Sequence, residues 1–350
     1  MKILKKLSIF IIIVVIFCGL LLKNTLADRY KEFITYAKDR YNTNENDEDN
    51  INKTLIKNDK PADKKIDVPN DSTQADKQIN EHSNIIKSAS NKELSNELDS
   101  YNYTATDYEG YYNVVKRSLE NFESSVSIRV NNYNANTYSL SVINNILDDH
   151  YDIDYGVQGA SGTIYSDGSM YVVNIEFKYK LNKNDMIHMR DETKAKAIQI
   201  ISRIITPKMN DLNKELAIHN YIVNNTVYDY DNYIKGTLSQ ASFTDYGVLI
   251  QGRAVCEGYS KAMFKLLNMA GVQCIVVKGT GNGESHAWNI VKINGKYTQV
   301  DATFDDPVTT NSENILSYNY FDISDSQMGK DHKWSIKKYP KCNTVKYNKN

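Results

Sequence analysis

The 350-residue sequence contains little cysteine, tryptophan or proline, with four, two and five residues of these types. Four cysteines without a Cys-x-x-Cys pair exclude a disulfide-rich scaffold and argue against a zinc ribbon or a thioredoxin-type redox site. An excess of one charge is also missing, because 42 Lys and Arg residues face 43 Asp and Glu residues. General nucleic-acid-binding proteins present a clustered basic surface, so we expect no nucleic-acid partner.

A long apolar run occurs at the N-terminus, over residues 7–22, with lysines on both sides. It is short for a membrane-spanning helix, which needs ~17–25 residues, and long for the apolar part of a signal peptide. We therefore predict that residues 1–27 are either a signal anchor or a signal peptide cleaved near residues 25–27. The remainder would be extracytoplasmic, either on a single-pass membrane protein held by residues 7–22 or as a secreted protein.

The next segment, residues 28–100, is rich in Asn, Asp, Glu, Lys and Ser and predicts a flexible polar linker. Residues 101–185 predict a small α/β accessory domain. In this domain, alternation predicts a strand over residues 125–130 and helical spacing predicts a helix over residues 137–150. Two further strands, over residues 161–166 and 169–181, are expected to form a hairpin across the turn dipeptide Asp167-Gly168.

Two helices are expected next, over residues 194–205 and 212–224. His219 lies on the apolar stripe of the second helix and is interpreted as a core residue.

A third helix starts at Cys256 and stops at Gly271. The free N–H groups and the dipole of a helix N-terminus favour a thiolate, which attacks carbonyl carbon, so Cys256 is a candidate nucleophile. The alternative is a buried structural cysteine. Residues 279–283 are predicted to form a flexible loop.

The dipeptide Asn294-Gly295 predicts a two-residue hairpin turn between strands over residues 286–293 and 296–303. In that register the numbers of paired residues sum to 589, so Trp288 faces Asp301. His286 and Asp301 then lie diagonally on one face of the sheet, within reach of a His–carboxylate hydrogen bond. Register and turn chemistry alone thus predict a His–Asp pair downstream of a candidate nucleophile.

A Cys, a His and an Asp in this arrangement are typical of acyl transfer: Cys256 attacks, His286 moves the proton and Asp301 orients the imidazole. The alternative for His286 and Asp301 is a structural pair on a surface hairpin. Gln251 is a candidate second oxyanion donor or a loop cap, and Trp288 a candidate wall of the site. Residues 305–306 suggest calcium ligands or, more simply, turn caps.

Three segments, residues 254–260, 286–289 and 300–307, closely resemble the bacterial transglutaminase-like superfamily. The resemblance covers roughly residues 190–335 and includes residues 320–321 and 332–334. It implies an α+β, papain-like fold for a catalytic domain at residues 190–340, with the cysteine on a helix N-terminus packed against an antiparallel sheet. It also implies that Cys256, His286 and Asp301 are nucleophile, base and third member. Val255 stands where animal transglutaminases carry Gln, which favours the protease-like branch.

The function predicted first is an extracytoplasmic thiol enzyme that cleaves or transfers peptide amide acyl groups on cell-surface or cell-wall proteins. The second is a transglutaminase that joins a Gln side chain to an amine. The third is a non-catalytic binding module on a transglutaminase-like scaffold. The expected partners are a peptide or protein substrate and the membrane, and no cofactor or metal is expected.

Overall fold

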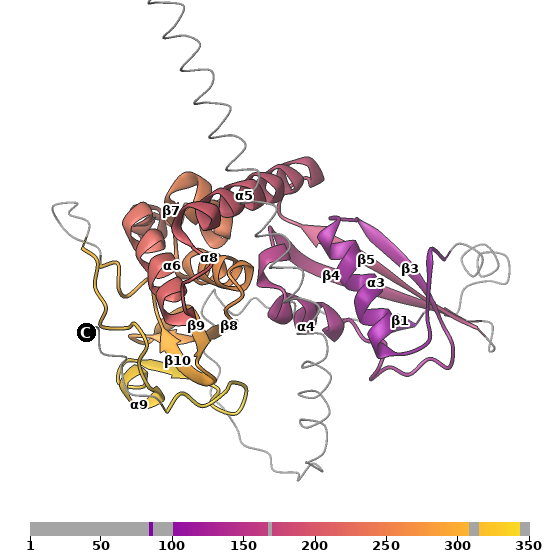
Figure 1. Ribbon diagram of the computed structural model, residues 1–350. Coiled ribbons are helices and arrows are strands. Elements are labelled where there is room, and N and C mark those ends of the chain that lie inside the picture. Colours follow the sequence, from indigo (N-terminus) through magenta and orange to yellow (C-terminus); the bar gives the residue numbers. More distant parts are fainter. Residues whose placement is uncertain (1–83, 87–100, 167–169, 308–314, 344–350) are drawn as a thin grey trace, which may run out of the picture.

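The computed structural model describes residues 84–86, 101–166, 170–307 and 315–343, which form a five-stranded, a four-stranded and a two-stranded sheet together with helices (Figure 1). The segments predicted as signal anchor or signal peptide (1–27) and as membrane contact (7–22) lie outside the described residues, as does most of the predicted linker (28–100). Among the described residues, no helix combines the length and apolar character needed to cross a membrane.

The first sheet lies in the N-terminal part of the described chain and has five strands in the order β1-β4-β5-β3-β2. Helices α3 and α4 pack against it and share one core with its strands (Figure 1). Its strands are Asn84–Ile86 (β1), Tyr103–Ala105 (β2), Ser125–Val130 (β3), Val157–Ser166 (β4) and Tyr171–Tyr179 (β5), and its helical elements are Tyr108–Glu120 (α3), Ser141–Asp149 (α4) and the 3-10 turn Tyr151–Ile153 (η2).

Most elements predicted for this part are present. The strand at 125–130 is confirmed, and β4 and β5 form the predicted antiparallel pair, although the turn at 167–168 lies outside the described residues. The predicted helix at 137–150 begins only at Ser141, because residues before it form a separate turn on Asn134. Asn84–Ile86 falls in the predicted linker but pairs in parallel with β4, so the linker prediction is wrong for these three residues.

Helix α5 connects the two larger sheets and their helices as one continuous element of 22 residues, Lys183–Ile204. The sequence prediction placed its start at 194 and was wrong. Asn182 caps the real start by accepting a hydrogen bond from the backbone N–H of Asp185 at 3.0 Å. The polar first half of this helix is held by Met186 and Met189, which are buried in a small cluster with residues of the N-terminal part. The expected boundary between residues 185 and 190 therefore falls inside a helix.

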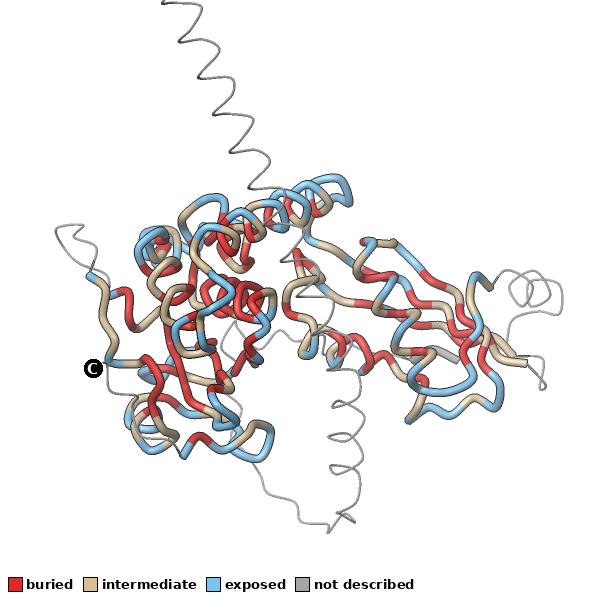
Figure 2. Tube along the Cα trace, in the orientation of Figure 1, coloured by how far each residue is buried: buried red, intermediate tan, exposed pale blue. Residues whose placement is uncertain are grey.

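The second sheet is antiparallel, with four strands in the order β10-β9-β8-β11. Helix α8 packs on β8 and β9, and buried residues follow this contact (Figure 2). The strands are Cys274–Gly281 (β8), Glu284–Ile293 (β9), Lys296–Val300 (β10) and His332–Trp334 (β11). The remaining elements are Asp211–Asn225 (α6), Val227–Tyr228 (β6), Tyr230–Lys235 (α7), Gln240–Phe243 (η3), the π-turn Gly247–Gln251 (η4), Arg253–Ala254 (β7), Cys256–Met269 (α8) and Asp325–Met328 (α9).

The hairpin register predicted from the Asn294-Gly295 turn is confirmed. Lys296 pairs with Ile293 and Val300 with Asn289, and both pairs sum to 589. The predicted loop at 279–283 is wrong, since β8 continues to Gly281 and a turn at Asn282 and Gly283, both with positive φ, leads directly into β9. An α+β arrangement of a helix on an antiparallel sheet, as predicted, results from these elements.

Candidate active site

The candidate nucleophile Cys256 is the first residue of α8, preceded by Val255 in an extended conformation. Its side chain is partly exposed, whereas Cys274 and Cys342 are buried. The start of α8 packs tightly on the preceding chain: a Cβ added at Gly258 would lie 2.8 Å from the backbone oxygen of Ser242. Cys256 thus sits where first-turn N–H groups lack partners within the helix and can stabilise negative charge.

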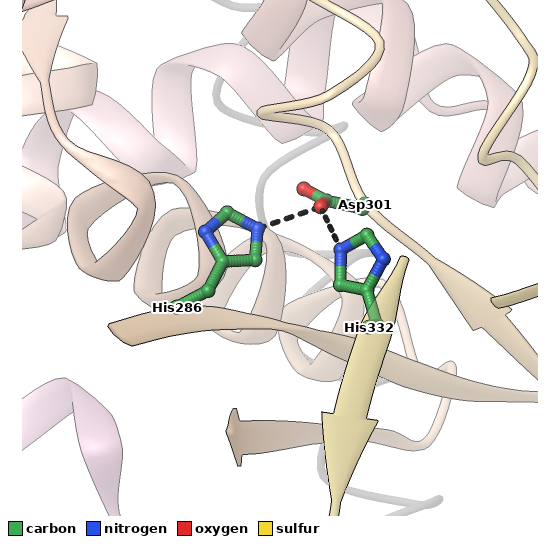
Figure 3. A group of neighbouring side chains, drawn as sticks. All are labelled: His286, Asp301 and His332. Carbon is green, nitrogen blue, oxygen red and sulfur yellow. Dashed lines mark hydrogen bonds and ion pairs between the residues drawn. The ribbon is translucent and has the colours of Figure 1, made fainter. Parts of the chain in front are cut away.

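His286 and Asp301 meet as the hairpin register predicts. His286 Nε2 lies 2.7 Å from Asp301 Oδ2 (Figure 3). The other carboxylate oxygen accepts the backbone N–H groups of Thr303 at 2.9 Å and Phe304 at 3.2 Å, which hold the carboxylate in place just after β10. Both side chains are almost completely buried.

Electrostatics favours an ion pair here. Burial lowers the pKa of His286, but the Asp301 carboxylate outweighs burial, and the Cys256 side chain adds to its effect, so the pKa of His286 is raised to about 10. Burial would raise the pKa of Asp301, but His286 and then His332 hold it well below its usual range. At neutral pH the imidazole is therefore protonated and the carboxylate ionised.

Side chains from other elements surround Cys256. Tyr228 of β6 is partly buried, and burial followed by the neighbouring Cys256 raises its pKa. Tyr233 of α7 donates its hydroxyl to Glu284 Oε2 at 3.0 Å, two residues before His286, and interacts electrostatically with Cys256. Residues of β6, α7 and β9 thus lie near the sulfur.

The other two predicted site residues, Trp288 and Gln251, differ from each other in burial and in their contacts with the His–Asp pair. Trp288 is buried, stacks on His286 with ring centroids 5.9 Å apart, and donates its indole N–H to Gln299 Oε1 at 2.7 Å. Trp288 therefore packs against one face of the His286 imidazole. Gln251 ends the π-turn η4 and is exposed, and no hydrogen bond within the described residues joins it to Cys256 or His286. Its role as an oxyanion donor stays a prediction.

Sequence reasoning gave no role to His332, the first residue of β11. This histidine is buried, with Nε2 3.1 Å from Asp301 Oδ2 and Nδ1 2.6 Å from Asp331 Oδ1 (Figure 3). β11 pairs with β8 rather than with a neighbour in sequence, so no turn dipeptide links its register to Asp301. The resemblance at residues 332–334 was the one available signal.

His286, Asp301 and His332 also form the one group of potential metal ligands found among the described residues, with ligand atoms within 4.8 Å of one another. Two ligands of a tetrahedral zinc ion with bonds of ~2.0–2.1 Å lie about 3.3 Å apart. The His286–Asp301 contact of 2.7 Å is shorter and has hydrogen-bond length. We therefore interpret the group as a hydrogen-bonded network.

Two further predictions concern side chains near this network. His219 is buried, as expected of a core residue, and its Nε2 lies 3.1 Å from Asp305 Oδ2. Asp305 also accepts the backbone N–H of Tyr320 at 3.0 Å, while Asp306 accepts the Tyr259 hydroxyl at 2.5 Å. Burial raises the pKa of Asp306 to about 6. The carboxyls of Asp305 and Asp306 thus both form hydrogen bonds within the protein. These contacts favour the capping interpretation over calcium ligation.

Family comparison agrees with this geometry. Residues 198–302 match the model of the transglutaminase-like superfamily, and this segment includes Cys256, His286 and Asp301. The resemblance seen in the sequence motifs is thus confirmed for this segment of the chain.

Curated relatives include kyphoscoliosis peptidase from Mus musculus, 28% identical over 137 residues, and from Homo sapiens, 26% identical over 156 residues. These matches cover 35% and 41% of this chain but only 20% and 23% of the relatives. A solved structure described as a TGase shares 17% identity over 60% of either chain, with a TM-score of 0.30.

Proposed function

We propose that this protein is a thiol enzyme that forms an acyl-enzyme on Cys256 and cleaves peptide amide bonds. The observation that supports this most directly is the 2.7 Å contact between His286 and Asp301, next to a partly exposed cysteine at a helix N-terminus. Nucleophile, base and orienting carboxylate come from three separate elements, and the family match spans all three residues.

In the proposed reaction, the Cys256 thiolate attacks the substrate carbonyl carbon, and N–H groups at the start of α8 stabilise the oxyanion. The tetrahedral intermediate collapses with formation of a thioester and cleavage of the C–N bond, and the leaving amine takes the proton of the His286 imidazolium. His286, now neutral, removes a proton from water as the water attacks the thioester. The acid is released, and the thiolate–imidazolium pair is restored. Asp301 stays ionised throughout and holds the imidazole.

An amine in place of water would complete a transglutaminase reaction through the same acyl-enzyme. We favour hydrolysis, because Val255 precedes the nucleophile where the animal enzymes carry Gln. We further propose, from the apolar run at residues 7–22, that the enzyme acts outside the cytoplasm on cell-surface or cell-wall proteins, either tethered at the membrane or secreted.

The test uses the full chain with casein, cell-wall peptides and a fluorescent primary amine. Cys256→Ala removes the nucleophile, and Cys274→Ser is the matched control because it changes a buried thiol of the same domain. Peptide release that is lost in Cys256→Ala alone supports hydrolysis, and Cys256-dependent incorporation of the amine selects the transglutaminase. Substrate binding without turnover, equal in the wild type and Cys256→Ala, would select the non-catalytic module and refute the enzyme proposal.

A further inference from the structure

The Asp301 carboxylate contacts two histidines. His286 and His332 approach the same oxygen, Oδ2, at 2.7 and 3.1 Å, and their ring centroids lie 5.3 Å apart (Figure 3). His332 is more deeply buried than His286, and its two ring nitrogens face Asp301 and Asp331. The proposed reaction uses only one of the two imidazoles, so the second requires its own explanation.

Donor and acceptor chemistry defines the state of His332. Each of its ring nitrogens faces a carboxylate oxygen, Asp301 Oδ2 on one side and Asp331 Oδ1 on the other. A neutral imidazole has a single N–H and would direct a lone pair at one of these anions, whereas an imidazolium donates to both. Asp331 is itself held by the Tyr320 hydroxyl, which donates to its Oδ2 at 2.5 Å. The geometry therefore fits a cation between two anions.

We propose that His332 is a positioning residue: an imidazolium shared between Asp301 and Asp331 that fixes the Asp301 carboxylate and moderates its hold on the His286 proton. This inference rests on the proposed function of His286. A carboxylate bonded to one imidazolium alone would retain that proton strongly, and His286 would be a poor acid toward a leaving amine. A second cation on the same oxygen weakens the field at His286 and makes proton donation easier.

The groups that face His286 come from several elements. Asp301 follows β10, Cys256 begins α8 and His332 begins β11, while Glu284 precedes His286 on β9 and interacts with Tyr228 near the sulfur. His332 supplies the one additional positive charge in the hydrogen-bonded network of Figure 3. Loss of its charge therefore leaves the negative groups around His286 less balanced.

The chain offers a matched pair of substitutions. His332→Gln keeps an N–H donor within reach of Asp301 but removes the charge. His219→Gln makes the same change at another fully buried histidine of this domain, whose Nε2 lies 3.1 Å from Asp305. The first readout is independent of turnover: ¹⁵N NMR of the full chain labelled at histidine. We expect His332 to carry protons on both nitrogens, because each faces a carboxylate oxygen, and a neutral His332 would overturn the proposal.

The second readout compares amide and ester substrates, because an ester leaving group depends less on protonation by His286. His332→Gln should lower kcat/KM for the amide about 3- to 10-fold more than for the matched ester, because His286 then becomes a weaker acid. His219→Gln should change both equally. An equal loss on both substrates in His332→Gln would assign His332 a merely structural role and overturn the proposal.

The two proposals can fail separately. A wild type without Cys256-dependent turnover refutes the enzyme, while the NMR experiment still decides the charge of His332. If His332→Gln does not fold, Asp331→Asn removes one of the two anions and serves as the second variant. It should increase the neutral fraction of His332 and reduce the amide-to-ester ratio, and a fully protonated His332 with an unchanged ratio would contradict the proposal.

Discussion

Asp301→Asn tests the electrostatics of the site most directly. The asparagine oxygen can still accept the N–H groups of Thr303 and Phe304, so the loop after β10 keeps its contacts while the negative charge disappears. In the wild type the pKa of His286 is raised from 6.5 to about 10, mainly by Asp301 against the effect of burial. That difference of about 3.5 units corresponds to about 5 kcal/mol in favour of the imidazolium.

Without this carboxylate, burial favours the neutral imidazole, and Cys256 loses the cation that stabilises its thiolate. An ordinary thiol with a pKa of ~8.5 is only about 1% thiolate at pH 6.5. We therefore expect the rate of Cys256 alkylation by iodoacetamide at pH 6.5 to fall at least about tenfold in Asp301→Asn.

The assay follows labelling of Cys256 by mass spectrometry across pH, with Cys256→Ala to identify the labelled site. Asp322→Asn is the matched control. Asp322 is also buried in this domain, but its carboxyl accepts a hydrogen bond from the Thr298 hydroxyl at 2.7 Å and is not hydrogen-bonded to His286. An Asp301→Asn profile that coincides with the wild type, in a protein with an unchanged circular dichroism spectrum, would refute the reasoning.

Three further predictions concern stability. Burial, followed by Asp322, raises the pKa of Glu215 well above its usual range. The folded state therefore keeps a proton that the unfolded state releases. As a result, the free energy of unfolding falls as pH rises above ~4.3, the ordinary pKa of a glutamate. Glu215→Gln should remove this loss and become more stable relative to the wild type between pH 5 and 8. Asp154→Asn should lower the free energy of unfolding by about 3 kcal/mol, because buried Lys261 of α8 then keeps only Glu257 as an anionic partner. Gly258→Ala should cost about 1–3 kcal/mol, since its Cβ would lie 2.8 Å from backbone.

Each of these predictions has a simple check in chemical denaturation. A constant stability difference between Glu215→Gln and the wild type across pH would show that Glu215 does not titrate as described. Lys261→Met removes the lysine as well as its charge and should cost less than Asp154→Asn, and the reverse order would contradict the ion-pair argument. Wild-type stability in Gly258→Ala would show that the chain before α8 can move aside.

Sequence reasoning succeeded where the relevant interactions are local. The Asn294-Gly295 turn and strand alternation determine which residues of β9 and β10 share a face, and this spacing alone is enough to place His286 beside Asp301. It failed for α5, whose first half is polar and is held by contacts with residues of the N-terminal part rather than by its own pattern. It also failed at residues 279–283, where glycines suggested a loop but sheet pairing continues to Gly281.

The sequence by itself therefore determined the helix start at Cys256, the hairpin and the pairing of His286 with Asp301, because these follow from spacing within one or two neighbouring elements. Only the tertiary structure decided that His332 reaches Asp301 across 31 residues and that two lysines of α8 pair with acids of the N-terminal part, Lys261 with Asp154 and Lys265 with Asp152. Such contacts depend on which strand joins the sheet edge and which surfaces bury one another. Local periodicity carries no information about either choice.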